Sequence, residues 1–129
     1  MKYLGIDYGA KRVGVAVSDR DATIAFPRAV FPNDAKLLSG LTKIVQEERI
    51  ESVVVGDTRS HGGGGNPVTA EAEVFIETLK SETKLPVESV PEVWSSIEAN
   101  RYAPKGEEHN DAAAAAFILQ RFLDMKGVI

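Results

Sequence analysis

The chain has 129 residues, of which 43% are hydrophobic and 26% charged, a composition that predicts a single globular domain over residues 1–129. It contains no cysteine, which excludes disulfides, thiolate zinc sites and cysteine nucleophiles. Fifteen basic against nineteen acidic residues give a formal charge of −4. This charge argues against a protein that coats nucleic acid by bulk attraction, but it is compatible with an enzyme that carries a local basic patch.

The distribution of apolar residues gives no sign of a membrane or export segment. No apolar run approaches the roughly 20 residues that a membrane-spanning helix needs. The first residues enter a strand pattern at once and leave no room for a signal peptide. We therefore expect a cytoplasmic protein with no membrane partner.

The first thirty residues predict three consecutive strands. Residues 2–7 form an apolar run that ends on an acid, residues 8–11 supply a turn, and residues 13–18 form a second strand, so this pair reads as a hairpin. A third short strand falls near residues 22–30. Pro27 within it predicts an edge position, because proline cannot donate to a neighbouring strand.

Helices and strands alternate after this point. Asn33-Asp34 predicts the cap of a helix over about residues 34–48, whose apolar stripe is formed by Leu37, Leu38, Leu41, Ile44 and Val45. Residues 51–56 read as a buried strand. A loop with four glycines, Gly62–Gly65, follows, and it lacks the Gly-Lys-Ser/Thr ending of a phosphate-cradling P-loop.

The last half of the chain continues the alternation. Asn66-Pro67 predicts a helix start, with Ala72, Phe75, Ile76 and Leu79 among its inward residues. Residues 85–90 read as a strand, Ser95 to Glu98 as a capping box that begins a short helix, and residues 102–109 as a polar loop. Asn110 caps a final helix on which Asp111, Ala114, Ala115, Ile118 and Phe122 have helical spacing.

This order, β-β-β-α-β-α-β-α-α, predicts an α/β fold with one mixed five-stranded sheet. A plain doubly wound fold would begin β-α-β. Three leading strands instead indicate an RNase H-like fold, in which three antiparallel strands are followed by parallel strands with helices on both faces.

Four carboxylates are candidates for metal binding. Asp7 ends the first strand, where a rigid sheet would hold it as a ligand for a hard cation. Asp57 and Glu92 follow later strands, whose carboxyl ends meet at one edge of a parallel sheet. Asp111 opens the last helix on the face of its apolar residues. Converging carboxylates of this kind bind two Mg²⁺ or Mn²⁺ ions about 3.5–4 Å apart in nucleases. Taken alone, Asp111 could equally be a helix-start acid favoured by the helix dipole, and an exposed strand-end acid is the more common interpretation of Asp57 or Glu92.

Basic and aromatic residues around these positions offer contacts for nucleic acid. Lys11, Arg12, Arg59 and Arg101 are candidates for phosphate binding, against the alternative of dispersed solubilising charge. Trp94 could stack on a base or belong to the core or its rim. His61 and His109 are interpreted as solvated loop residues, with a general-base or substrate-contact role for His109 as the alternative.

The segment Leu4-Gly-Ile-Asp-Tyr-Gly-Ala-Lys-Arg-Val-Gly-Val-Ala-Val-Ser-Asp19 resembles the YqgF/RuvX family. The resemblance continues through Val53-Val-Val-Gly56, the glycine loop and the ending Asn110-Asp-Ala-Ala-Ala-Ala-Ala-Phe-Ile-Leu-Gln120. Members of that family are described as Holliday-junction-resolvase-like nucleases and as pre-16S rRNA processing nucleases. The resemblance implies an RNase H-like fold and a divalent-metal site in which Asp7 is the first acid and Asp111 the last.

The chain departs from the family pattern at three positions. Where the family has Asp-Glu-Arg followed by Ser/Thr, this chain reads Pro91-Glu92-Val93 and then Trp94-Ser95. Leu-Pro after the strand-end glycine is replaced by Asp57-Thr58, and a paired Asp by Asn110-Asp111. Two metal sets therefore remain open: Asp7, Glu92 and Asp111, which we prefer, and Asp7, Asp57 and Asp111.

Three functions compete on this basis. The leading hypothesis is a metal-dependent endonuclease that cleaves pre-16S rRNA or a Holliday junction, acting as a monomer or weak homodimer, with Asp7, Glu92 and Asp111 at the metals. The altered segment at Glu92 motivates an alternative, a catalytically weakened RNA-binding ribosome-assembly factor. A third, an actin-like phosphotransferase, rests on Gly5-Ile-Asp7-Tyr-Gly9 and is disfavoured because those ATPases need two such domains.

Overall fold

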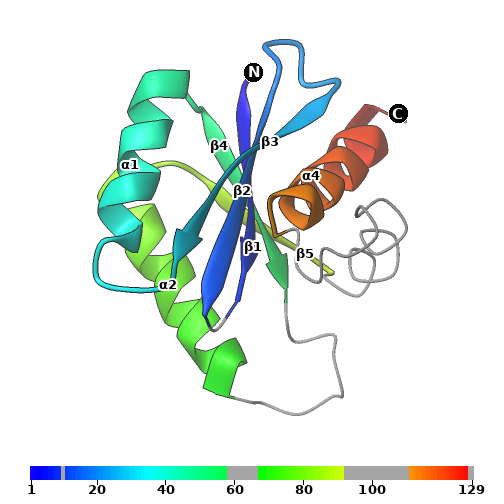
Figure 1. The fold of residues 1–129 in the computed structure, drawn as a ribbon. Coiled ribbons are helices and arrows are strands. Elements are labelled where there is room, and N and C mark those ends of the chain that lie inside the picture. The colour runs from blue at the N-terminus through cyan, green and yellow to red at the C-terminus, as the bar shows by residue number, and fades with distance from the viewer. Residues whose placement is uncertain (10, 58–66, 92–110, 128–129) are drawn as a thin grey trace.

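A single mixed sheet organises the computed structural model, which describes residues 1–9, 11–57, 67–91 and 111–127 (Figure 1). Its strands lie in the order β3-β2-β1-β4-β5. Their bounds are β1 (Tyr3–Tyr8), β2 (Arg12–Ser18), β3 (Ala25–Pro32), β4 (Ser52–Asp57) and β5 (Val87–Pro91). Within these ranges the helices are α1 (Leu37–Glu48), α2 (Pro67–Thr83) and α4 (Asp111–Gly127).

The strand directions confirm the predicted RNase H-like arrangement. β1 pairs antiparallel with β2 and β2 with β3, whereas β1 pairs parallel with β4 and β4 with β5. β3 is an edge strand, as Pro27 predicted, and the pairing shifts register between Val15 and Ala16, the latter opposite Pro27. The three parallel strands therefore end at one common edge of the sheet.

One face of the sheet packs against α1 and α2 (Figure 1). Strand residues such as Leu4, Ile6 and Val55 are fully buried there, because alternate residues of a strand point to the same face. The apolar stripe predicted for α1 is confirmed: Leu37, Leu41 and Ile44 are buried, and Leu38 and Val45 pack against the same core.

The opposite face packs against α4 alone among the described helices (Figure 1). Ala115, Ile118, Leu119, Phe122 and Leu123 of α4 are buried in a second core with Tyr3, Ala16, Val54 and Val90 of the strands. Both faces of the sheet are thus covered by helices, as the sequence predicted.

Two boundaries differ from the prediction. The helix expected from residue 34 begins at Leu37, and no side chain caps it. Asp34 Oδ1 accepts the Lys36 N–H at 2.9 Å, which closes a turn just before the helix, so the predicted Asn33-Asp34 cap is wrong. The third strand runs from Ala25 to Pro32 rather than near 22–30. None of the helices in the described ranges combines the length and apolarity that crossing a bilayer requires.

Candidate active site at the carboxyl edge of the sheet

Asp7 is the next-to-last residue of β1, and its side chain is half-buried. Its neighbours Ile6 and Tyr8 belong to the core beneath α1 and α2. Strand alternation therefore directs Asp7 to the other face, which α4 covers. Asp7 pairs with Gly14 of β2, so the residue beside it on that face has no side chain. The carboxylate is held on β1, the central strand of the sheet, which pairs with β2 on one side and with β4 on the other.

The packing of α4 brings its first turn toward the same edge. Phe122 lies against Tyr3 with ring centroids 5.4 Å apart, whereas Ala115 and Leu119 lie over Gly5. The helix therefore runs opposite to β1, and its amino-terminal turns approach the Asp7 end. Asp111 begins α4 one turn before Ala115, which places the backbone of the predicted last acid toward the predicted first acid.

Gly5 allows this close approach. A Cβ atom at Gly5 would lie 2.7 Å from Leu119 Cβ and 3.2 Å from the Ala115 carbonyl oxygen. Any side chain at this position would push α4 away from the sheet. The absence of a side chain at Gly5 thus helps to set the distance between β1, which carries Asp7, and α4.

Asp57 is the last residue of β4 and is in register with Pro91, the last residue of β5. The backbones of β1, β4 and β5 consequently end side by side, as the sequence predicted for parallel strands. Glu92, the acid that follows β5, lies outside the described residues. The same holds for the other predicted residues in the two long gaps, which are Arg59, His61, Gly62–Gly65, Trp94, Arg101 and His109.

Two of the residues predicted to bind phosphate, Lys11 and Arg12, lie at the turn between β1 and β2, and both are exposed. Asn33 ties this hairpin to the end of β3: its Nδ2 donates to the Gly9 carbonyl at 2.8 Å, and its backbone N–H donates to the Lys11 carbonyl at 2.9 Å. A Cβ at Gly9 would lie 2.6 Å from the Arg12 carbonyl oxygen. Sequence reasoning missed this role of Asn33, because its partners are distant in the chain.

The donor set at this edge suits a hard divalent cation, since carboxylate oxygens are the ligands such cations prefer. Among the described residues, no group of three or more acids or histidines is close enough together to hold a metal ion. Of the four predicted metal ligands, Asp7 is the one whose side chain belongs to the described part of the chain. The side chains of Asp57 and Asp111 and all of Glu92 are outside that part of the chain, so the choice between the two metal sets stays a prediction.

A family model described as "RuvX: Holliday junction resolvase" matches residues 1–125. The chain belongs to the RuvX family. A relative from Nitratidesulfovibrio vulgaris, named a pre-16S rRNA nuclease, is 37% identical over 131 residues, covering 100% of this chain and 88% of its own length. A second relative with that name, from Oleidesulfovibrio alaskensis, is 37% identical over 97% of this chain and 93% of its own length. Because its family model and its full-length relatives are those of nucleases, this RuvX-family chain is a nuclease that hydrolyses phosphodiester bonds.

Solved structures confirm the fold. Thermus thermophilus RuvC in complex with a Holliday junction substrate superimposes with a TM-score of 0.66 at 14% identity, covering 99% of this chain and 96% of that one. The fowlpox virus Holliday junction resolvase gives a TM-score of 0.59 at 13% identity, covering 97% and 99%. At this level of identity the likeness establishes the RNase H-like architecture of the RuvX-family chain.

Proposed function

We propose that this nuclease is a divalent-metal-dependent endonuclease that processes pre-16S rRNA, with its active site at the carboxyl edge of the sheet. The observation that carries the proposal is the position of Asp7, half-buried on the central strand and on the face where α4 begins with Asp111. The substrate is inferred from the names of the full-length relatives.

In this proposal Asp7, Glu92 and Asp111 hold Mg²⁺ or Mn²⁺. When bound, the cations polarise the phosphodiester and lower the pKa of water to supply the nucleophile. The chain's own contribution is positioning. β1 fixes the position of Asp7, and the packing of α4 on Gly5 fixes the position of the first turn of α4. Lys11 and Arg12 on the adjoining hairpin bind backbone phosphates.

Strand phase argues against Asp57 as the third ligand. Val54 and Val90 belong to the core beneath α4, the face of Asp7. Position 57 instead has the strand phase of Val53 and Val55, which are buried beneath α1 and α2. Asp57 is therefore the less suitable partner for Asp7, and Glu92 is the preferred third ligand.

The test is cleavage of a structured rRNA-precursor fragment by purified protein in Mg²⁺ or Mn²⁺. We expect metal-dependent cutting that EDTA abolishes and that Asp7→Asn reduces more than about 100-fold, since even residues that only orient metal ligands cost 10–100-fold. Asp21→Asn, which removes an exposed acid elsewhere, is the matched control and should cut normally. Full activity of Asp7→Asn would overturn the proposed site, and cutting of a four-way DNA junction instead would overturn the RNA substrate.

A second candidate function is a catalytically weakened RNA-binding factor in ribosome assembly. The Pro91-Glu92-Val93 segment favours it, because the acid and the arginine that flank this glutamate in the family are absent. Tight binding of the rRNA fragment without metal-dependent turnover would support this function over cleavage.

A further inference from the structure

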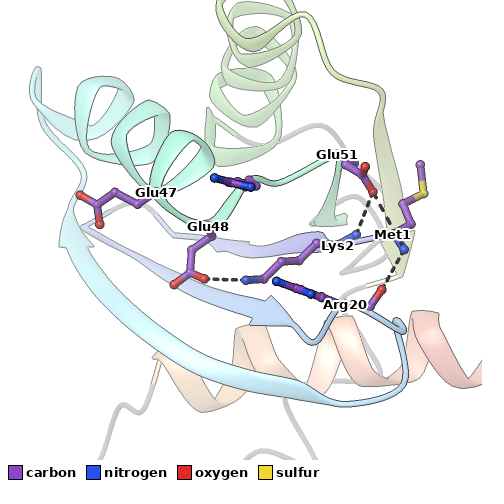
Figure 2. A pocket seen from close by; sticks show the side chains of 7 residues that line it. Met1, Lys2, Arg20, Glu47, Glu48 and Glu51 are labelled. Atoms are coloured by element: carbon purple, nitrogen blue, oxygen red, sulfur yellow. Dashed lines mark hydrogen bonds and ion pairs between the residues drawn. The ribbon is translucent and has the colours of Figure 1, made fainter.

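An open pocket of about 710 Å³ lies at the opposite edge of the sheet from Asp7 (Figure 2). It is lined by Met1 and Lys2 before β1, Arg20 between β2 and β3, Glu47, Glu48 and Arg49 at the end of α1, and Glu51 before β4. Asp7 is five residue steps along the chain from Lys2, roughly 17 Å at about 3.3 Å per step. A ligand in this pocket would therefore be distinct from the phosphodiester at the proposed cutting site.

The three carboxylates in this pocket have partners. Glu48 binds Lys2 Nζ at 2.8 Å and Arg28 Nε at 3.1 Å, and these hydrogen bonds, first from Lys2 and then from Arg28, lower the pKa of its carboxyl. Glu47 pairs with Arg28 at 3.5 Å and with Lys43 at 3.9 Å. Glu51 accepts the Lys2 backbone N–H at 3.2 Å and lies 4.0 Å from the amino group of Met1. Each of the three carboxylates thus has a cationic partner within the protein.

Arg20 and Arg49 remain without such partners. Among the described residues, neither guanidinium takes part in an ion pair or a hydrogen bond. Arg20 and Arg49 line the same pocket, and Lys2, whose Nζ is paired with Glu48, lines it as well (Figure 2). Each guanidinium offers a planar fork of donors that matches a phosphate group.

The position of Arg49 at the end of a helix has a simpler explanation, in which its positive charge only stabilises the carboxyl end of the helix dipole. The local geometry indicates that the side chain is available for binding a ligand. The last carbonyls of α1 already accept backbone donors: the Val45 oxygen binds Ile50 N–H at 3.0 Å and the Gln46 oxygen binds Arg49 N–H at 3.4 Å. The Arg49 side chain is therefore not used as a cap. Its backbone is left-handed, with φ of 55°, so the chain turns sharply where this side chain leaves the helix.

We infer that this pocket is a second phosphate-binding site, in which Arg20 and Arg49 bind one phosphate group beside Lys2. The ligand chemistry is a phosphate monoester or diester. Its source is either the backbone of a bound RNA strand or a free phosphate compound. Neither source needs Asp7, so the site can be tested independently of cleavage.

The experiment follows the side-chain Nε–H resonances of arginine in ¹⁵N-labelled Asp7→Asn protein, which binds RNA without cutting it under the proposed function. Inorganic phosphate is titrated first, and a short single-stranded RNA lacking terminal phosphates second. We expect saturable shifts of the Arg20 and Arg49 signals with at least one probe. The double variant R20Q/R49Q should weaken that binding at least tenfold, whereas K80Q/K84Q, which removes the same charge from exposed positions outside the pocket, should not.

The two probes separate the sources. Shifts with RNA alone assign the site to a nucleic-acid backbone, and shifts with inorganic phosphate as well assign it to a free anion. The inference is overturned if neither probe shifts these signals, or if R20Q/R49Q lowers only the thermal midpoint and binds as the parent does. It is also overturned if K80Q/K84Q weakens binding equally, because the effect would then be general charge.

Discussion

The Asp19 carboxylate, in the turn after β2, accepts three hydrogen bonds from Thr23 N–H, Ile24 N–H and Thr23 Oγ1, at 2.8 to 3.1 Å. These bonds, the one from Thr23 N–H first, lower the pKa of Asp19 from its ordinary value in the folded chain. A lowered carboxyl pKa stabilises the fold above the unfolded pKa, and this contribution is lost as pH falls from there through the folded pKa. We therefore predict that Asp19→Asn lowers the urea midpoint at pH 7 and lowers it less at pH 3.

Asp21→Asn is the control for this prediction, since Asp21 is an exposed acid of the same turn. Its urea midpoint should differ little from that of the parent at either pH. An equal loss of stability for Asp19→Asn at pH 7 and pH 3 would show that the charge of Asp19 has no part in the effect.

Asn33 joins two segments that are far apart in the sequence, and its Nδ2–H bond to the Gly9 carbonyl is partly buried. We predict that Asn33→Ala lowers the free energy of unfolding by about 1 kcal/mol, the usual contribution of one such bond. The β1–β2 hairpin should also open more often, so the Val13 amide, opposite Tyr8, should exchange faster with deuterium. Denaturant titration and hydrogen exchange measure the two effects.

Ser39→Ala is the matched control for Asn33→Ala. Ser39 Oγ donates to the Lys36 carbonyl within one exposed turn of α1, so its loss should change stability by less than about 0.5 kcal/mol. If the Val13 amide exchanged at the parent rate in Asn33→Ala, the hairpin would be held by its own strands and Asn33 would have no positioning role.

Between elements, the contact of β1 with α4 leaves no room for an additional carbon atom at Gly5. A methyl group at Gly5 would meet Leu119 Cβ at 2.7 Å and a helix carbonyl at 3.2 Å, and neither can rotate away. We predict that Gly5→Ala costs about 1–3 kcal/mol of unfolding free energy, as overpacking of a core does. It should also reduce cleavage in the folded fraction, because α4 carries Asp111. Denaturant midpoints and single-turnover rates measure these two losses.

Gly40→Ala provides the matched control on α1. Its Cβ would meet the Phe31 ring at 2.9 Å, but that ring is the flexible end of a partly buried side chain, and alanine favours a helix over glycine by up to about 1 kcal/mol. Its stability should therefore change little. Similar losses for both variants would mean that the α4 contact is not specially tight.

The elements were predictable where local patterns determine them, and less so where distant contacts do. Apolar strands ending at residues 7, 18 and 56, and a helix start at Pro67, follow from periodicity and from proline chemistry, and the structure places boundaries within one residue of these. The start of α1 was misplaced because Asn33 binds Gly9 instead of capping. Likewise, Asp7 could be chosen from its strand end and its family motif, whereas the closeness of α4 depends on Gly5 meeting Leu119, which no local pattern reports.

For the whole molecule, the formal charge of −4 opposes the approach of a polyanion, so nucleic acid must be bound through local arrangement of charge. The described basic residues near the proposed active site are on the β1–β2 hairpin, at the carboxyl edge of the sheet. Arg20 and Arg49, which line the pocket described above, are at the opposite edge. A substrate bound at the carboxyl edge would respond to charge there and little to charge elsewhere.

This difference predicts the salt dependence of binding. Lys11 is exposed at the carboxyl edge, whereas Lys84 is exposed between α2 and β5 at the opposite edge, so Lys11→Gln and Lys84→Gln change the total charge equally. For single-stranded RNA, each neutralised phosphate contributes about 0.7 to the slope of log affinity against log salt concentration. We expect Lys11→Gln, in the Asp7→Asn background, to reduce that slope by about 0.7 and Lys84→Gln to leave it unchanged. Fluorescence anisotropy with labelled RNA over a range of salt concentrations gives both slopes. Equal effects of the two substitutions would show that total charge, and not the hairpin beside Asp7, controls how this nuclease binds RNA.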